Sequence, residues 1–185
     1  MSGFTLRVRS FLALAGLACL GACSSGAGES GESPFRWSIS TAVEIDAPAS
    51  RVWDVLVDLP AYPEWNPFIV AAEGKVAVGE TLSLRMALPG WKPVTIEPRL
   101  LVVEPERELR WKGRLLIPGL FDGEHAFVFT ALEDGRTRID HSERFAGILL
   151  PIAKGMIYEA TEQSFHALDA ALAQRAAGSV TAAHR

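Results

Sequence analysis

Hydrophobic and polar residues alternate along most of the chain from residue 36 onward. In residues 36–45 the odd positions are apolar or Thr and most even positions are polar or small, which predicts a strand with one buried face. The same period of two predicts further strands in residues 69–75, 81–88, 93–104, 108–116, 124–132 and 136–145. The pattern therefore favours an antiparallel sheet of about seven strands.

Helical spacing occurs in two places. A short apolar stripe that stops before Pro60 predicts a helix after the first strand, with Asp46 as its cap and Pro48 in its first turn. Residues 152–176 predict one long helix, whose apolar side carries Met156, Ala160, Ser164, Leu168, Ala171 and Leu172. Because one long helix must cover a whole apolar sheet face, we expect an α+β domain whose sheet curves around the helix and leaves a space between them.

The segment YPEWNPF, residues 62–68, carries three aromatic rings and two prolines. The prolines argue against a regular helix or a central strand. Two interpretations stay open, a buried plug and the rim of a ligand cavity. Asn66 precedes a proline and is therefore extended, so we interpret it as a local cap.

The first residues have the pattern of an export signal. Arg7 and Arg9 precede an apolar run over residues 11–20 that is too short to span a bilayer, and small residues follow it. The tetrapeptide that ends at Cys23 resembles a bacterial lipobox, which implies cleavage after residue 22 and a lipid on Cys23. An ordinary cleaved signal with an incidental Cys is the alternative. An Asp directly after the lipidated Cys would resemble an inner-membrane retention signal, but residue 24 is Ser. The expected location is therefore the periplasmic face of the outer membrane.

Removal of residues 1–22 leaves 163 residues with 16 basic and 22 acidic side chains, a net charge of −6. Because no Lys/Arg cluster remains, a nucleic-acid partner is excluded. Cys19 leaves with the signal, so the mature chain forms no internal disulfide. We expect a flexible tether over 23–35, one monomeric domain over 36–176 and a disordered tail over 177–185.

The hairpin of residues 124–145 brings polar side chains to an apolar face. Its apolar residues fall on odd positions in both strands, so odd must oppose odd for both to face the core. A two-residue turn would break that match, whereas a three-residue turn or bulge with Gly135 in the left-handed region restores it. His125 then lies opposite Glu143 or Phe145.

In the same registers His141 lies opposite Phe129 or Phe127. A His beside Glu143 in an apolar cavity could act as a general base, which makes His125, His141 and Glu143 the catalytic candidates. The alternative is that these polar groups only satisfy one another in the core. No metal site is predicted, because the three ligands lack motif spacing, and no cofactor is expected.

The chain from 36 to 176 resembles the START-like, or SRPBCC, family and its polyketide-cyclase-like bacterial branch. The resemblance rests on ISTAVEIDAPASRVWDVLVDLPAYPEWNPF, GLFDGEHAFVF, GRTRIDHSERFAGILLP and the terminal helix. It implies a helix-grip fold with two short helices after the first strand. It also implies a deep apolar cavity for lipids, steroids or aromatic polyketides, and it places YPEWNPF at the cavity rim with Trp65 turned inward.

The resulting hypothesis is a membrane-anchored lipoprotein that carries or senses a hydrophobic small molecule without catalysis. The alternative is a cyclase/dehydratase-like or hydrolytic enzyme that uses the hairpin residues. Trp91 is the weaker cavity candidate among the tryptophans. The predicted ligand contacts are Trp65, Phe68, Leu84, Met86, Trp111, His125, Phe127, Phe129, His141, Glu143, Met156, Ala160 and Ser164.

Overall fold

A computed structural model describes residues 33–114 and 117–178. The predicted signal, Cys23, most of the tether and nearly all of the tail lie outside these residues. In chain order the elements are β1 (Arg36–Ile45), α1 (Ala49–Val57), the 3₁₀ helix η1 (Leu59–Ala61), α2 (Tyr62–Trp65), β2 (Ile69–Glu73), β3 (Ser83–Met86), β4 (Val94–Ile96), β5 (Arg99–Glu104), β6 (Glu108–Arg114), β7 (Asp122–Ala131), β8 (Thr137–Ala146) and α3 (Leu150–Gly178).

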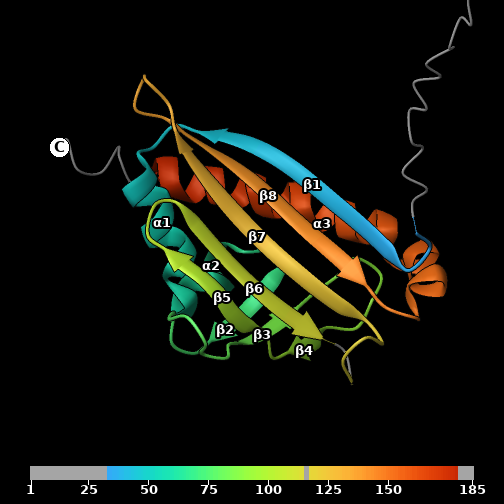
Figure 1. The fold of residues 1–185 in the computed structure, drawn as a ribbon. Coiled ribbons are helices and arrows are strands. Elements are labelled where there is room, and N and C mark those ends of the chain that lie inside the picture. The colour runs from blue at the N-terminus through green and yellow to red at the C-terminus, as the bar shows by residue number, and fades with distance from the viewer. Residues whose placement is uncertain (1–32, 115–116, 179–185) are drawn as a thin grey trace, which may run out of the picture. The chain divides into compact units, whose positions relative to one another are not determined.

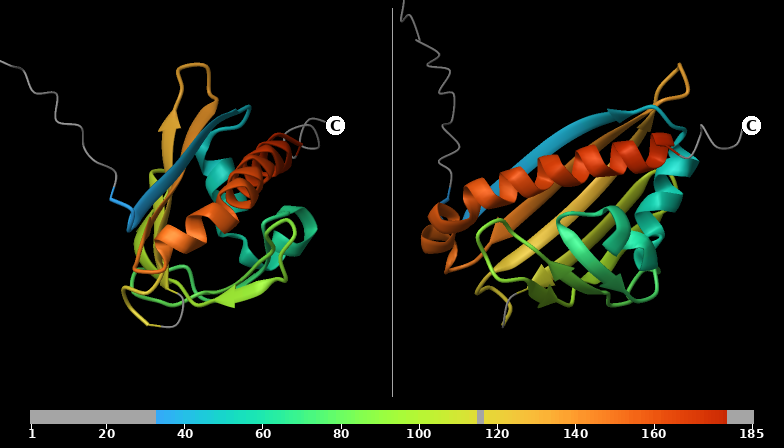
Figure 2. Two further views of the ribbon diagram at one scale, coloured as in Figure 1. Left: turned by 90° about the vertical axis from the view of Figure 1, so that its right-hand side faces the viewer. Right: turned by 180° about the vertical axis from the view of Figure 1, so that it is seen from behind.

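The strands form two antiparallel sheets. The larger sheet has the order β1-β8-β7-β6-β5, and the smaller has the order β2-β3-β4 (Figure 1). Helix α3 runs across one face of the larger sheet, and the smaller sheet turns underneath it (Figure 2). This arrangement confirms the predicted helix-grip fold, with the short helices between β1 and β2 as expected.

The predicted strand over residues 93–104 is instead two strands in different sheets. The break falls at Glu97 and Pro98, between β4 and β5. Proline has no N–H to donate to a strand ladder, so it ends one run of pairing, and its carbonyl accepts from the Leu82 amide instead. The described residues therefore contain eight strands in two sheets rather than about seven in one.

The predicted cap of the first helix is also wrong. Helix α1 begins at Ala49 with Pro48 as its N-cap residue, and no side chain caps it. Asp46 lies two residues before that position, too early for its carboxylate to serve as the N-cap acceptor. The turn is held instead by the Thr137 hydroxyl, which donates to the Ala47 carbonyl at 2.8 Å.

The hairpin of β7 and β8 has the predicted register. His125 pairs with Glu143 and Phe127 pairs with His141. The Leu132 amide donates to the Arg136 carbonyl around a three-residue turn, and Gly135 has φ of +83°. The requirement that odd positions oppose odd positions is therefore confirmed, and with it the inward direction of the polar side chains.

The two halves of α3 pack differently against the sheet. Residues 151–160 are exposed or half-buried. Among the described residues, no helix, α3 included, is long and apolar enough to cross a membrane. From Thr161 onward one face is buried against the sheet, which is the core-facing stripe of an amphipathic helix. That face consists of Thr161, Ser164, Phe165, Leu168, Asp169, Leu172 and Ala176.

The turn between β8 and α3 depends on a glycine. Gly147 has φ of +151°, and a Cβ on it would lie 2.4 Å from the Leu120 carbonyl oxygen. We expect Gly147→Ala to lower the free energy of unfolding by about 2 kcal/mol or more, because backbone atoms cannot easily move aside. Gly155→Ala, on α3 with no atom near its added Cβ, is the control and should stabilise by about 1 kcal/mol. Urea denaturation measures both, and a Gly147→Ala protein as stable as wild type would contradict the account.

Candidate functional site

An apolar cavity of about 420 Å³ lies between the two sheets and the first half of α3. This volume is within the range of small-molecule sites in proteins. Its walls come from β3, β4, β6, β7, β8, α3 and the loops beside them. The lining residues are Phe68, Met86, Leu88, Trp91, Lys92, Val94, Ile96, Trp111, Gly113, Arg114, Phe121, Gly123, Glu143, Phe145, Leu149, Ala153, Met156, Ile157 and Thr161.

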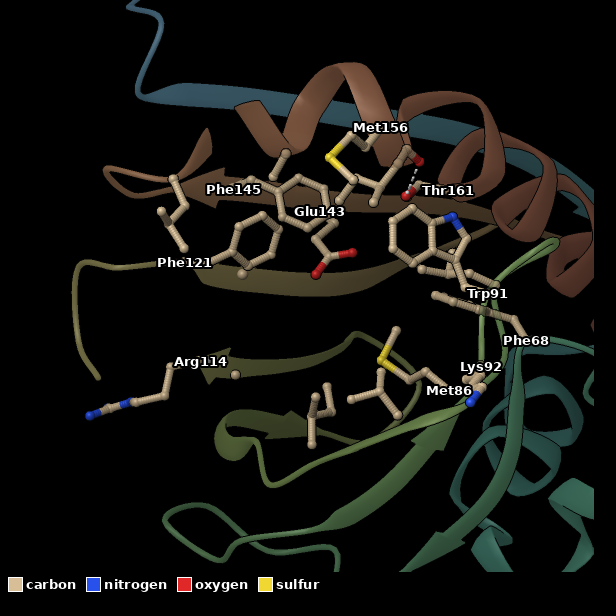
Figure 3. Close-up of a pocket in the computed structure, with 18 of the residues that line it drawn as sticks. Phe68, Met86, Trp91, Lys92, Arg114, Phe121, Glu143, Phe145, Met156 and Thr161 are labelled. Atoms are coloured by element: carbon tan, nitrogen blue, oxygen red, sulfur yellow. Dashed lines mark hydrogen bonds between the residues drawn. The ribbon is translucent and has the colours of Figure 1, made fainter. Parts of the chain in front are cut away.

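Glu143 is the ionisable side chain within this apolar wall, and it is half-buried. Lys92 and Arg114 are exposed at the edge of the cavity, and the Thr161 hydroxyl donates to the Ile157 carbonyl within α3. Figure 3 shows the Glu143 carboxylate turned into the cavity, with Phe121 on one side and the Trp91 ring on the other. Glu143 is therefore the charged group placed for polar recognition inside the cavity.

A chain of buried polar side chains continues behind Glu143. Its carboxylate Oε2 lies 3.6 Å from Nδ1 of His125, within ion-pair range but beyond a hydrogen bond. Nε2 of His125 is 2.6 Å from Nε2 of His141, and Nδ1 of His141 is 2.7 Å from Oδ1 of Asp169. The Thr41 hydroxyl donates to the other oxygen of Asp169. The chain thus joins the cavity wall on β8 to the middle of α3.

Aromatic rings enclose the two imidazoles. The His141 ring stacks on Phe165 with centroids 4.0 Å apart and on Phe127 at 4.3 Å. The His125 ring stacks on Trp111 at 4.6 Å. These contacts exclude water and fix the ring planes, so each ring nitrogen faces one partner.

The environment of His141 determines its protonation. Burial lowers the pKa of His141 to about 4, since the charged ring loses its hydration. The hydrogen bond to Asp169 opposes this shift, and the neighbouring His125 adds to it. His141 is therefore neutral at neutral pH and donates from Nδ1 to the Asp169 carboxylate.

The predicted ligand contacts divide into two groups. Phe68, Met86, Trp111, Glu143 and Met156 line the cavity, although the Met156 side chain is also well exposed. The others lie in the core or beside it rather than on the cavity wall. These are Trp65, Leu84, His125, Phe127, Phe129, His141, Ala160 and Ser164. Of the three catalytic candidates, only Glu143 reaches the cavity.

The aromatic and proline segment behaves mainly as a plug. Tyr62 is buried, donates its hydroxyl to the Leu56 carbonyl at 2.7 Å and meets the Trp65 ring edge-on. Contrary to the expectation from the prolines, one turn of helix forms here, because Pro63 occupies the first turn where its missing N–H costs nothing. Trp65 does not line the cavity, and only Phe68 of the segment does.

The cap predicted at Asn66 is confirmed. Its side-chain oxygen accepts hydrogen bonds from the amides of Phe68 at 3.0 Å and Ile69 at 2.8 Å. These bonds fix the chain as it leaves α2 and enters β2. The cap therefore holds the Phe68 ring where it can reach the cavity.

Sequence reasoning missed Asp169, Thr41 and Gly123. Asp169 lies at helical spacing within the buried stripe of α3, and an acidic residue in such a stripe was an available signal. Thr41 shares the inward face of β1, but Thr is common in strands, so its type gives no signal of a buried polar partner. Gly123 has no side-chain pattern to reveal it. Trp91, the weaker cavity candidate among the tryptophans, does line the cavity.

Comparison with known proteins places the chain in a family. The helix-grip architecture is the fold of START-like proteins. Residues 36–177 match the family described as polyketide cyclase / dehydrase and lipid transport, so the chain belongs to this family. A search of curated proteins finds no match.

Solved structures with the same fold include three of distinct origin. The Zhui aromatase/cyclase from Streptomyces sp. R1128 is 21% identical, with a TM-score of 0.68 over 80% of this chain and 98% of that one. A START superfamily protein from Mycobacterium smegmatis is 19% identical, with a TM-score of 0.62 over 77% and 98%. Norcoclaurine synthase from Thalictrum flavum is 15% identical, with a TM-score of 0.58 over 76% and 94%. These identities establish a shared fold and no shared reaction.

The buried His141 makes stability depend on pH. Unfolded His takes up a proton below about pH 6.5, whereas folded His141 does so only near pH 4. Stability should therefore fall as pH falls through this window, by up to about 3 kcal/mol from this residue. In His141→Gln the side-chain amide can still donate to Asp169 and accept from His125, but it does not titrate. The stability of this variant should therefore decline less steeply than that of wild type as the pH falls.

Urea denaturation of the wild type and the variant at several pH values between 7 and 4 measures this difference. His166→Gln, an exposed substitution on the same helix, should keep the wild-type decline. Parallel declines in wild type and His141→Gln would contradict the assignment.

Proposed function

We propose that the protein binds a hydrophobic small molecule, such as a lipid or a polyketide-like compound, as a carrier or sensor. The observation that carries the proposal is the cavity itself, an apolar space of about 420 Å³ with the half-buried carboxylate of Glu143 on its wall. Burial of apolar ligand surface would supply the affinity, at about 25 cal/mol for each Å² removed from water. The family description, which includes lipid transport, supports the same function.

Filling the cavity tests this proposal. Ala153 on α3 lines the cavity, so Ala153→Trp should place an indole in the ligand space. We expect binding of the apolar fluorophore N-phenyl-1-naphthylamine to weaken by about tenfold or more. Ala167→Trp, at an exposed position on the same helix, should leave binding unchanged. Fluorescence titration gives both constants, and equal affinities for wild type and Ala153→Trp would reject the cavity as the binding site.

A second candidate function is an enzyme of the cyclase/dehydratase or hydrolase type. The chain from Glu143 through His125 and His141 to Asp169 favours it, because linked carboxylates and imidazoles are the usual parts of general acid–base sites. In this candidate Glu143 is the group that touches the substrate, and His125 and His141 act through it. Loss of turnover with retained binding in a Glu143 variant would favour the enzyme over the carrier.

We further propose that the mature protein begins at Cys23, carries a lipid there and faces the periplasm from the outer membrane, with residues 36–176 as its domain. The support is the sequence alone, the lipobox-like LGAC behind an Arg-flanked apolar run. Exposed apolar residues beside the cavity fit a protein that takes its ligand from a membrane. They include Trp91, Val94, Ile152 and Met156.

Changing the proposed lipid site tests the anchor. Cys23→Ser should release the domain from the membrane fraction or leave the precursor uncut, because stable anchoring needs the acyl chains that this Cys would carry. Cys19→Ser, within the part that is removed, is the control and should fractionate as wild type does. Immunoblots of membrane and soluble fractions measure this. Normal processing and membrane recovery of Cys23→Ser would exclude the lipid anchor.

A further inference from the structure

The hydrogen bonds behind Glu143 have a single consistent direction. Asp169 accepts from Thr41 on one oxygen and faces Nδ1 of His141 with the other. Neutral His141 that donates from Nδ1 has no proton on Nε2. The 2.6 Å contact between the two Nε2 atoms then requires His125 to supply the proton. His125 is therefore protonated on Nε2.

This direction leaves Nδ1 of His125 facing Glu143 without a proton of its own. The carboxylate oxygen nearest to this nitrogen is Oε2 of Glu143, at 3.6 Å. Oε2 is therefore the oxygen that faces His125, and Oε1 is the oxygen left for another partner.

The other oxygen of Glu143 is free for a ligand. Across residues 33–114 and 117–178, no protein donor forms a hydrogen bond with Oε1 of Glu143. Gly123 provides the space for this oxygen, since a Cβ there would lie 2.6 Å from Oε1. The side chain lines the cavity, as Figure 3 shows. Oε1 thus offers its lone pairs to a hydrogen-bond donor in the cavity.

We propose that Glu143, backed by His125, His141 and Asp169, is a recognition site for a neutral hydroxyl group on an otherwise apolar ligand. The ligand hydroxyl donates to Oε1 while its apolar part fills the space between the sheets and α3. A ligand carboxylate is disfavoured at this wall, because the buried chain already carries a net negative charge. The cationic groups that could pair with an anion, Lys92 and Arg114, lie at the exposed edge.

This inference rests on the proposed binding function, and a matched pair of probes separates the two. 2-Naphthol and 2-methylnaphthalene have nearly the same shape, but only the first donates a hydrogen bond. In Glu143→Met, 2-naphthol should bind about tenfold more weakly than in wild type, the loss expected for a hydrogen bond to a charged group. 2-Methylnaphthalene should bind the variant as well as wild type or better, which also shows that the variant is folded. Glu159→Met, an exposed change on α3, is the control and should alter neither affinity.

The outcomes are distinguishable. If wild type binds neither probe, the proposed binding function is wrong and the inference falls with it. If both probes bind but 2-naphthol binds Glu143→Met as tightly as wild type, the binding function stands and the hydroxyl site is overturned.

The direction of the chain has its own spectroscopic test. With ¹⁵N-labelled histidine, His141 should be protonated on Nδ1 and His125 on Nε2, with a scalar coupling between the two Nε2 nitrogens across their hydrogen bond. A His141 ring protonated on Nε2 and bare on Nδ1 would overturn the proton arrangement.

Discussion

The packing of α3 against the larger sheet is the constraint on which the rest of the structure depends. A sheet with one apolar face has a single long helix to cover it, and beyond Leu150 the helix α3 has a buried face only from Thr161 onward. Residues 151–160 stay exposed or half-buried and form a wall of the cavity through Ala153, Met156 and Ile157. The cavity therefore follows from incomplete coverage, and the smaller sheet closes the remaining side.

The buried polar chain ties this packing to the chemistry of the cavity. Asp169 lies on the packed half of α3, and its partners Thr41 and His141 lie on neighbouring strands of the sheet. A buried carboxylate without such partners would be strongly unfavourable. Burial of Asp169 therefore requires both the position of α3 and the pairing of β1 with β8. The same groups then orient His125 toward Glu143. A change in helix packing would thus alter the surroundings of Glu143 on the cavity wall.

Much of the fold was predictable from local pattern. Strand periodicity and the odd-to-odd rule predicted the hairpin register. A shift of one residue in that register would have exposed the apolar face of one strand to solvent. The split at Pro98 was missed because the residues around it are apolar enough for one long strand. Only the different pairing partners of β4 and β5 show that there are two strands. The helical turn at Tyr62 does not follow from the general rule that proline breaks helices, because Pro63 lies in the first turn, where proline is tolerated.

The candidate site was less predictable, for a physical reason. The direction of a side chain follows from strand parity, so His125, His141 and Glu143 were correctly expected to face inward. How deeply a side chain is buried does not follow from strand parity. Trp111 stacks on His125 and Phe165 stacks on His141, so of the three candidates only Glu143 reaches the cavity. Asp169 comes from a segment remote in sequence, so its contact with His141 depends on how α3 crosses the sheet.

A crystal structure of the protein with bound 2-naphthol would test the central claim most directly. The account predicts the naphthalene ring between Trp111 and the first half of α3, with its oxygen within hydrogen-bond distance of Oε1 of Glu143. A cavity closed by side chains, or a ring bound with its oxygen turned to the exposed edge near Lys92, would contradict it.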